Sequence, residues 1–301
     1  MATIVRHIEY DYNGYRKIMK ELTARFSFLK EEVIGKTVFG RDIVALKIEG
    51  KRNEYTLYTA AIHGSERITA TVLFRFIETL CLALERDGKV SGIDAKKALI
   101  GKGVIFVPLC NPDGCEISLK GELGCGPHSA RIKRLCGSDF EHWNANLRGV
   151  DLNHNFDAGW ERLHKQEQEL GYIGPGPTRY GGHRPESEPE TIALANLCRN
   201  KKIRALYCFH SQGEVIYWDY NGIETTRGRK IAEIFAASSL YSIEVPIGIA
   251  TGGGFKDWFI EIFRRPGFTI ELGKGKNPLP AEMGSAIYDQ IEEMMTIGLL
   301  M

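Results

Sequence analysis

The sequence has no long hydrophobic stretch. No apolar run among its 301 residues approaches the roughly 18–20 residues of a membrane-spanning helix. The first residues, MATIVRHIEYDYNGYRK, lack the apolar core and small-residue cleavage site of a signal peptide. We therefore expect no contact with a membrane and a cytoplasmic location.

An excess of one charge and paired cysteines are missing as well. Lysine and arginine total 39, and aspartate and glutamate total 38. Without a basic block, this balance argues against a nucleic-acid partner. The seven cysteines are scattered, and no CxxC pair occurs, so a cysteine-type zinc site is not expected. Such an odd, unpaired set is typical of reduced thiols in the cytoplasm.

Repeats, low-complexity tracts and shifts in composition are also absent, which predicts a single domain over residues 1–301. Strand-like apolar runs without polar alternation are separated by segments of helical periodicity. Strands that are apolar on both faces indicate an α/β fold, in which helices cover both sides of a largely parallel or mixed sheet. The expected strands are 33–39, 43–49, 55–62, 103–109, 203–209, 242–247 and 267–272, and the expected helices are 12–29, 66–86, 187–199, 225–239, 255–264 and 282–298.

The stretch 110–186 differs from the rest of the chain. It is rich in Gly, Pro, Asn, His and Arg and shows little periodicity. A loop region of that length inside a compact domain is usually functional.

Polar side chains follow four of the expected strands, where ligands bind in open α/β sheets. His63 and Glu66 follow the strand 55–62, Asn111 and Asp113 follow the strand 103–109, and His210 follows the strand 203–209. The last residue, Glu271, lies within the apolar strand 267–272.

His63, Glu66 and His210 form a ligand set of the catalytic zinc type, in which the fourth position is left for water. Gly64 allows a tight turn after the strand, so that His63 and Glu66 can converge on one ion. The HxxE pattern alone is weak evidence, because it recurs at 164–167 and 183–186. We interpret the second copy as a solvated helix face and the third as a surface loop.

Glu271 is flanked by Phe268, Ile270 and Leu272. A carboxylate in such a strand is costly to bury unless it is paired or functional. Burial would raise its pKa and suit it to proton transfer. An outward-facing strand residue or a structural ion pair is the alternative.

The segment 143–156 is too polar to lie in a core. Arg148 could stabilise an oxyanion, and Asp151 could accept the second imidazole N–H of a metal-bound histidine. Asn153 and His154 could hold polar groups of a substrate. On its own, the segment would also fit an Asx-rich surface turn.

Taken together, these motifs resemble the M14 zinc carboxypeptidase family. They run in the family's order as HGSE, NPDG, RGVDLNHNF, HSQG, ATGGGFKDW and TIELG. The resemblance implies one α/β domain with a mixed, eight-stranded sheet. It also implies one Zn²⁺ held by His63, Glu66 and His210, with Glu271 promoting attack of water and Asp151 supporting His63.

The chain departs from the family at several positions. The family's Asn-Arg pair, which clamps a terminal carboxylate, is Asn153-His154 here, and a single imidazole contact is weaker than a guanidinium fork. The family's mobile Tyr is also missing, since Ile249 precedes Ala250. Arg148 is the candidate for the arginine that stabilises the oxyanion. If the family's arginine aligns nearer Asn144 instead, that role is vacant or filled from elsewhere.

The DLNHNF variant and the later GKGKNPLP look most like the bacterial γ-D-glutamyl-diamino-acid peptidases, without their wall-binding repeats or a prosegment. That branch implies a small cell-wall peptide as the substrate. Phe255 and Lys256 fall where the family shapes its substrate pocket, and Lys256 could meet a second substrate carboxylate. An ordinary carboxypeptidase, a related zinc deacylase and a silent peptide-binding module remain the alternatives.

Overall fold

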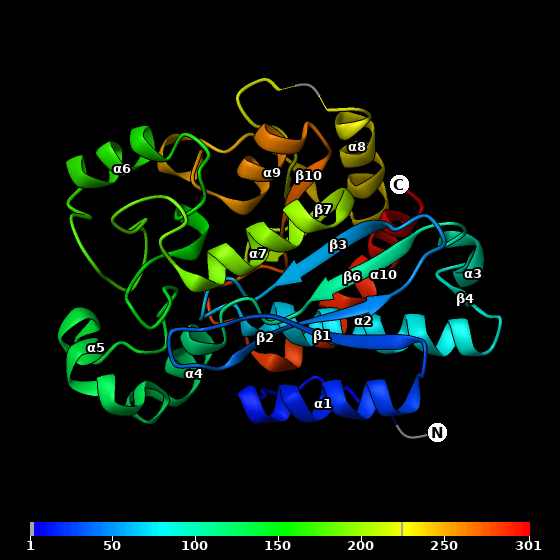
Figure 1. The fold of residues 1–301 in the computed structure, drawn as a ribbon, viewed down its shortest axis with the longest axis horizontal. Helices are drawn as coiled ribbons and strands as arrows, with labels where there is room; N and C mark the ends of the chain where they lie inside the picture. Colours follow the sequence, from blue (N-terminus) through cyan, green and yellow to red (C-terminus); the bar gives the residue numbers. More distant parts are fainter. Residues whose placement is uncertain (1–2, 224) are drawn as a thin grey trace.

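The computed structural model describes residues 3–223 and 225–301. Its described part contains an eight-stranded sheet in the order β1-β2-β6-β3-β7-β10-β8-β9 (Figure 1). The four strand pairs β3/β6, β3/β7, β7/β10 and β8/β9 are parallel, and the other three pairs are antiparallel. The strands are β1 (Leu29–Lys36), β2 (Asp42–Ile48), β3 (Glu54–Ala60), β6 (Gly103–Val107), β7 (Lys202–His210), β8 (Val215–Tyr217), β9 (Ser242–Ile243) and β10 (Gly267–Glu271).

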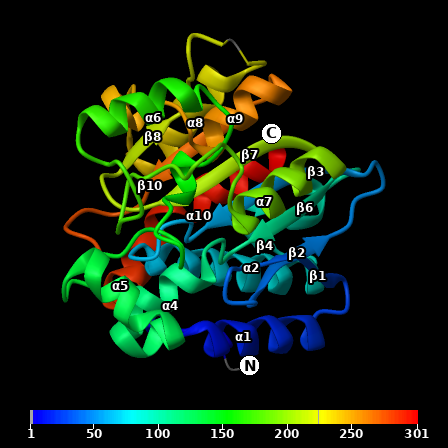
Figure 2. The same cartoon turned by 60° about the vertical axis from the view of Figure 1, so that its left-hand side comes forward.

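Helices cover both faces of this sheet, as the apolar strands predict. On one face, the core contains side chains of α1 (Tyr12–Arg25), α2 (Arg67–Glu85), α8 (Gly228–Ser239) and α10 (Gly284–Leu300). On the other face, α7 (Pro189–Asn200) and α9 (Phe255–Phe263) pack against the strands. Figure 2 shows α7 on the opposite side of the strands from α10. The prediction of a single α/β domain with about eight strands is therefore confirmed.

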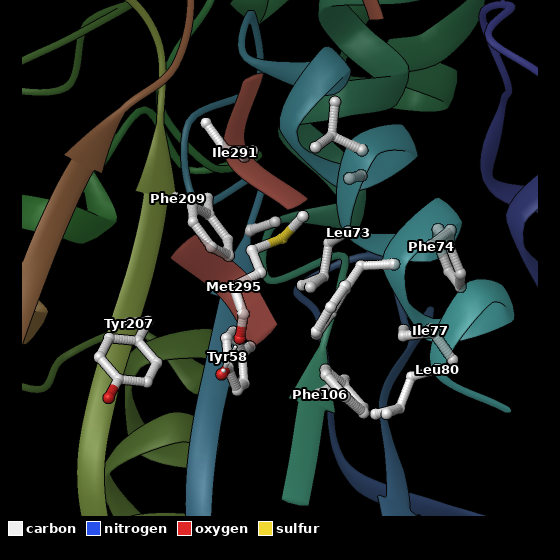
Figure 3. Packing of buried hydrophobic residues seen from close by; sticks show 14 of the residues in the cluster. Tyr58, Leu73, Phe74, Ile77, Leu80, Phe106, Tyr207, Phe209, Ile291 and Met295 are labelled. Atoms are coloured by element: carbon white, nitrogen blue, oxygen red, sulfur yellow. Dashed lines mark hydrogen bonds between the residues drawn. The ribbon is translucent and has the colours of Figure 1, made fainter. Parts of the chain in front are cut away.

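Alternate residues of the central strands enter the two cores. Tyr58 of β3 and Tyr207 of β7 lie on the α2/α10 side, with ring centroids 4.9 Å apart. Leu57 of β3 belongs to the opposite core. Figure 3 shows Tyr58 among Phe106, Leu73 and Met295. Burying large side chains on both faces fixes the register of the strands, because a slip of one residue would exchange the faces.

Two expectations about secondary structure are wrong. The expected strand 242–247 is only Ser242–Ile243, at the edge of the sheet. The stretch 110–186 is not one continuous loop, since it contains the helices α4 (Pro112–Lys120), α5 (Ser129–Cys136) and α6 (Trp160–Glu169). These helices are only 8 to 10 residues long, which is why their periodicity is hard to detect.

The remaining described elements are short. They are β4 (Lys89–Val90), β5 (Ile93–Asp94), α3 (Ala95–Ala98) and the 3₁₀ turns η1 (Gly121–His128), η2 (Leu152–His154), η3 (Gly248–Ala250) and η4 (Ala281–Met283). Among the helices that the structure describes, none combines the length and apolar character needed to cross a bilayer.

Candidate active site

The parallel pairing of β3, β7 and β10 brings the predicted residues to one edge of the sheet. Ala60 at the end of β3 pairs with Phe209 of β7, and His210 of β7 pairs with Glu271 of β10. His63 follows β3 by three residues. Because these strands end at the same edge, residues far apart in the sequence meet there.

His63, Glu66 and His210 form a compact cluster. His63 Nδ1 lies 2.8 Å from Glu66 Oε1, and His210 Nδ1 lies 3.2 Å from Glu66 Oε2. The two Nδ1 atoms are 3.3 Å apart. The ligand atoms of the three side chains lie within 4.8 Å of one another.

The donor set fits a tetrahedral metal ion such as zinc. His63 Nε2 lies 3.1 Å from Asp151 Oδ1, so its proton is directed at that carboxylate and the Nδ1 lone pair is directed at the cluster. Glu66 Oε2 is buried and makes no hydrogen bond within the described residues. With zinc–ligand distances of about 2.0–2.1 Å and tetrahedral angles, neighbouring ligand atoms stand about 3.3 Å apart.

The electrostatics of the cluster also favour a cation. Burial opposes the charged form of His63, but the Glu66 and Asp151 carboxylates hold its pKa well above its usual value. Burial opposes ionisation of Glu66 as well, yet the two imidazoles lower its pKa to about 2. Two ionised carboxylates in a buried site require positive charge nearby, which a divalent ion supplies.

Asp151 is held in place behind His63. Its Oδ2 accepts hydrogen bonds from Arg179 N at 2.8 Å and from Thr178 Oγ1 at 3.2 Å. Although burial raises the pKa of this carboxyl, the His63 and His154 imidazoles and the Arg179 amide lower it well below its usual range. The carboxylate can therefore fix the orientation of the His63 ring.

Close backbone packing positions the loop that carries His63. A Cβ atom at Gly64 would lie 2.4 Å from Gly114 O and 2.5 Å from Trp143 O, so only glycine fits. The Asn111 amide donates to Ile62 O, Asn144 O and Ala145 O. Gly64 is thus required by the close approach of neighbouring chain segments as well as by the turn itself. Asn111 holds these segments together through its hydrogen bonds.

Glu271 lies in the same cavity as the cluster. The cavity has a volume of about 220 Å³ and is lined by His63, His210 and Glu271 together with Tyr217 and Thr269. Burial raises the pKa of Glu271 to about 7, although the His210 imidazole opposes that rise. A divalent ion in the cluster would lower it again. Without such an ion, Glu271 can exchange a proton near neutral pH.

Three of the residues predicted to bind substrate also line this cavity: Asn153, His154 and Lys256. Asn153 Oδ1 accepts from Phe255 N at 3.1 Å, which leaves its amide nitrogen for a ligand. Lys256 is buried, with its ammonium 2.5 Å from both Asp219 O and Asp257 Oδ1. It is not the solvated lysine that a helix start would suggest.

Two other predicted site residues lie elsewhere. Arg148 is not among the residues that line the cavity. Its side chain is half exposed, and Nη1 lies 3.5 Å from Glu188 Oε2. Phe255 is completely buried and stacks on Phe156, with centroids 4.7 Å apart. The structure thus gives Arg148 an ion pair and Phe255 a place in the core.

The interpretation of residues 164–167 as a solvated helix face is wrong. Glu167 is completely buried, and its Oε1 lies 2.5 Å from His154 Nδ1. Sequence reasoning missed this residue, although α6 buries Trp160, Leu163 and Glu167 at the i, i+3 and i+7 positions of one helical face. The third HxxE pattern is a surface loop, as predicted, with His183 exposed and Glu186 paired with Arg199.

Comparison with known proteins agrees with this geometry. The family model described as zinc carboxypeptidase, Peptidase_M14, matches residues 15–296. A γ-D-glutamyl-L-diamino acid endopeptidase of Lysinibacillus sphaericus is 34% identical over 297 residues, which is 96% of this chain and 72% of the relative. Murein peptide amidase A of Escherichia coli is 24% identical over 239 residues, 77% of this chain and 76% of the relative.

A comparison with solved structures agrees on the fold. Bovine thrombin-activatable fibrinolysis inhibitor superimposes with a TM-score of 0.74 at 19% identity, covering 98% of this chain and 96% of the other. The match of the family model to nearly the whole chain, together with the first relative, identifies this protein as a member of the M14 zinc carboxypeptidase family and hence as a metallopeptidase.

Proposed function

We propose that the protein is a zinc peptidase that hydrolyses the amide bond between γ-D-glutamate and a diamino acid in small cell-wall peptides. His63, Glu66 and His210 would hold one zinc ion, and Asp151 would orient His63. The observation that carries the proposal is the position of Glu271 in the same cavity as that ligand cluster.

Zinc bound at this cluster would supply Lewis-acid polarisation of the scissile carbonyl and acidify a water molecule. Glu271 would accept the proton of the attacking water and deliver it to the leaving amine nitrogen. Its strand position beside His210 places Glu271 in the cavity that holds the ligand cluster.

Lys256, Asn153 and His154 support a substrate that carries several carboxylates. The first relative's name specifies a γ-D-glutamyl diamino acid bond. In such a peptide, the glutamyl α-carboxylate lies near the scissile bond, and diaminopimelate carries one carboxylate more than lysine. We assign Lys256 to that additional carboxylate, since its ammonium is buried at the cavity wall.

An ordinary carboxypeptidase activity is the second candidate, favoured by the match of residues 15–296 to the family model described as zinc carboxypeptidase. Such an enzyme needs a clamp for the terminal carboxylate. In this cavity, Asn153 and His154 can each donate a single hydrogen bond to that carboxylate, whereas the guanidinium group of an arginine would donate two. A related zinc deacylase would share the metal site, but its substrate would not be a peptide.

The test is incubation of the zinc-loaded protein with L-Ala-γ-D-Glu-meso-diaminopimelate, its L-lysine analogue and a hippuryl substrate, with products identified by mass spectrometry. We expect release of L-Ala-D-Glu and intact hippuryl substrate. Cleavage of the hippuryl substrate alone would overturn the substrate assignment. No cleavage of any of the three would overturn the peptidase proposal and leave the deacylase or the silent peptide-binding module.

Two variants test the assigned roles. Glu271→Gln should retain zinc and lose turnover, whereas the exposed Glu282→Gln should change neither. Lys256→Gln should raise KM for the diaminopimelate peptide more than for the lysine peptide. An equal effect of Lys256→Gln on both peptides would show that Lys256 does not contact the distal carboxylate.

A further inference from the structure

A buried carboxylate holds the ring of His154 from behind. Glu167 has no exposed surface, and its Oε1 lies 2.5 Å from His154 Nδ1. Its Oε2 accepts from Gly181 N at 3.3 Å and lies 3.5 Å from His164 Nδ1. The side chains of His154, Glu167 and His164 thus form a series of contacts between the substrate cavity and helix α6.

The surroundings of Glu167 leave little positive charge to balance it. Burying an ionised carboxylate is costly unless a cation or several donors compensate it. The polar contacts of the Glu167 carboxylate within the described residues are the two imidazoles and the Gly181 amide. Of these partners, His154 Nδ1 is the closest, at 2.5 Å, so the His154 ring is the group that this carboxylate holds most tightly.

Packing keeps both histidines in place. The His164 ring stacks on Trp160 at 4.5 Å with an interplanar angle of 12°. Trp160 Nε1 donates to Gly181 O at 3.0 Å, and a Cβ atom at Gly181 would come 2.5 Å from His154 O. The chain around His154 therefore has little freedom to move.

This geometry determines which atom of His154 can meet a ligand. With Nδ1–H directed at Glu167 Oε1, Nε2 is the remaining ring nitrogen, and His154 lines the cavity. In the imidazolium form, Nε2–H donates to an anion. The Asp151 carboxylate also interacts electrostatically with this ring. The Lys256 ammonium lines the same cavity and contacts Asp219 O and Asp257 Oδ1, which leaves one N–H for a substrate.

We propose that Glu167 is a positioning residue for substrate recognition, which holds His154 so that its Nε2–H binds a carboxylate on the leaving diamino acid. The proposal rests on the proposed peptidase function. Glu167 touches neither the metal cluster nor the reacting atoms, so its effect reaches the substrate through the ring of His154.

The test compares two substrates that differ at one group: L-Ala-γ-D-Glu-meso-diaminopimelate with a free carboxylate next to the scissile amide, and the same peptide with that carboxylate as an amide. Glu167→Gln keeps an oxygen acceptor for Nδ1–H but removes the charge. For the acid, we expect KM to rise about ten- to a hundredfold, the loss of one charge-assisted hydrogen bond, with kcat within about twofold. KM for the amide should not change.

Three controls separate this role from a structural one. Glu169→Gln alters an exposed carboxylate on the same helix and should leave both substrates unaffected. His154→Gln should remove the preference for the acid to the same extent, and the double variant Glu167→Gln/His154→Gln should be no worse, because the two residues act as one unit.

The outcomes distinguish the proposals. If Glu167→Gln impairs acid and amide equally, Glu167 only supports the fold and the inference is wrong. If Glu167→Gln does not fold, His154→Gln still decides, since an unchanged acid preference in that variant excludes the His154 contact. If the wild-type enzyme cleaves neither peptide, the proposed function has failed.

Discussion

The buried residue Glu190 allows a quantitative test of the packing beside the candidate active site. This side chain is completely buried on α7. Its Oε1 accepts from Val38 N at 3.2 Å, and its Oε2 accepts from the Asn146 amide at 3.1 Å. Its neighbour Glu188 accepts from the same amide and also has Arg148 as a cation. Burial therefore raises the pKa of Glu190 to about 7.

The sign of the effect on stability follows from linkage. Between pH 4.5 and 7, folded Glu190 keeps a proton that the unfolded chain has released. The free energy of unfolding therefore falls as the pH rises through this window. A rise in pKa from the usual 4.5 to about 7 corresponds to a loss of about 3 kcal/mol, fully developed above pH 7.

The perturbation is Glu190→Gln, which removes the titration. We expect the wild-type free energy of unfolding, minus that of the variant, to fall by about 3 kcal/mol between pH 4.5 and 8. Denaturant unfolding of both zinc-loaded proteins across this range measures it. The exposed Glu293→Gln serves as the control. A difference that does not vary with pH would refute the assignment of a proton to Glu190.

Three further predictions concern the metal site and its framework. His210→Ala should lower bound zinc well below one ion per chain by elemental analysis, and full occupancy would contradict its role as a ligand. Arg148→Ala should leave kcat within about twofold of the wild-type value, because Arg148 pairs with Glu188. A hundredfold loss of kcat would show that Arg148 stabilises the oxyanion. Gly64→Ala should cost about 1–3 kcal/mol of stability and weaken zinc binding, because its Cβ would meet Gly114 O; normal stability would mean that the loop can shift.

The metal cluster could be predicted from the sequence because strand ends in a parallel sheet share an edge. His63, His210 and Glu271 each follow or end an apolar run. Their convergence then needs only the parallel order of β3, β7 and β10. Only His63, three residues beyond the end of β3, also depends on the conformation of a loop.

Residues on long connections could not be placed in this way. Arg148 is on a segment whose course depends on contacts such as Asn146 with Glu188, 42 residues away. Phe255 begins α9, and the sequence does not show which face of that helix meets Phe156. The three-residue strand β8 was missed for a different reason, since so short a run carries no period.

Glu167 also changes what an arginine at position 154 would do. Oε1 of Glu167 lies 2.5 Å from His154 Nδ1, so a guanidinium there would pair with Glu167 by charge-assisted hydrogen bonds before it met a substrate. We expect His154→Arg alone to give little hydrolysis of hippuryl substrates. His154→Arg/Glu167→Gln should raise their kcat/KM at least about tenfold above the single variant, because the fork is then free for a terminal carboxylate. An equal gain from the single variant would show that Glu167 does not control the charge at this position.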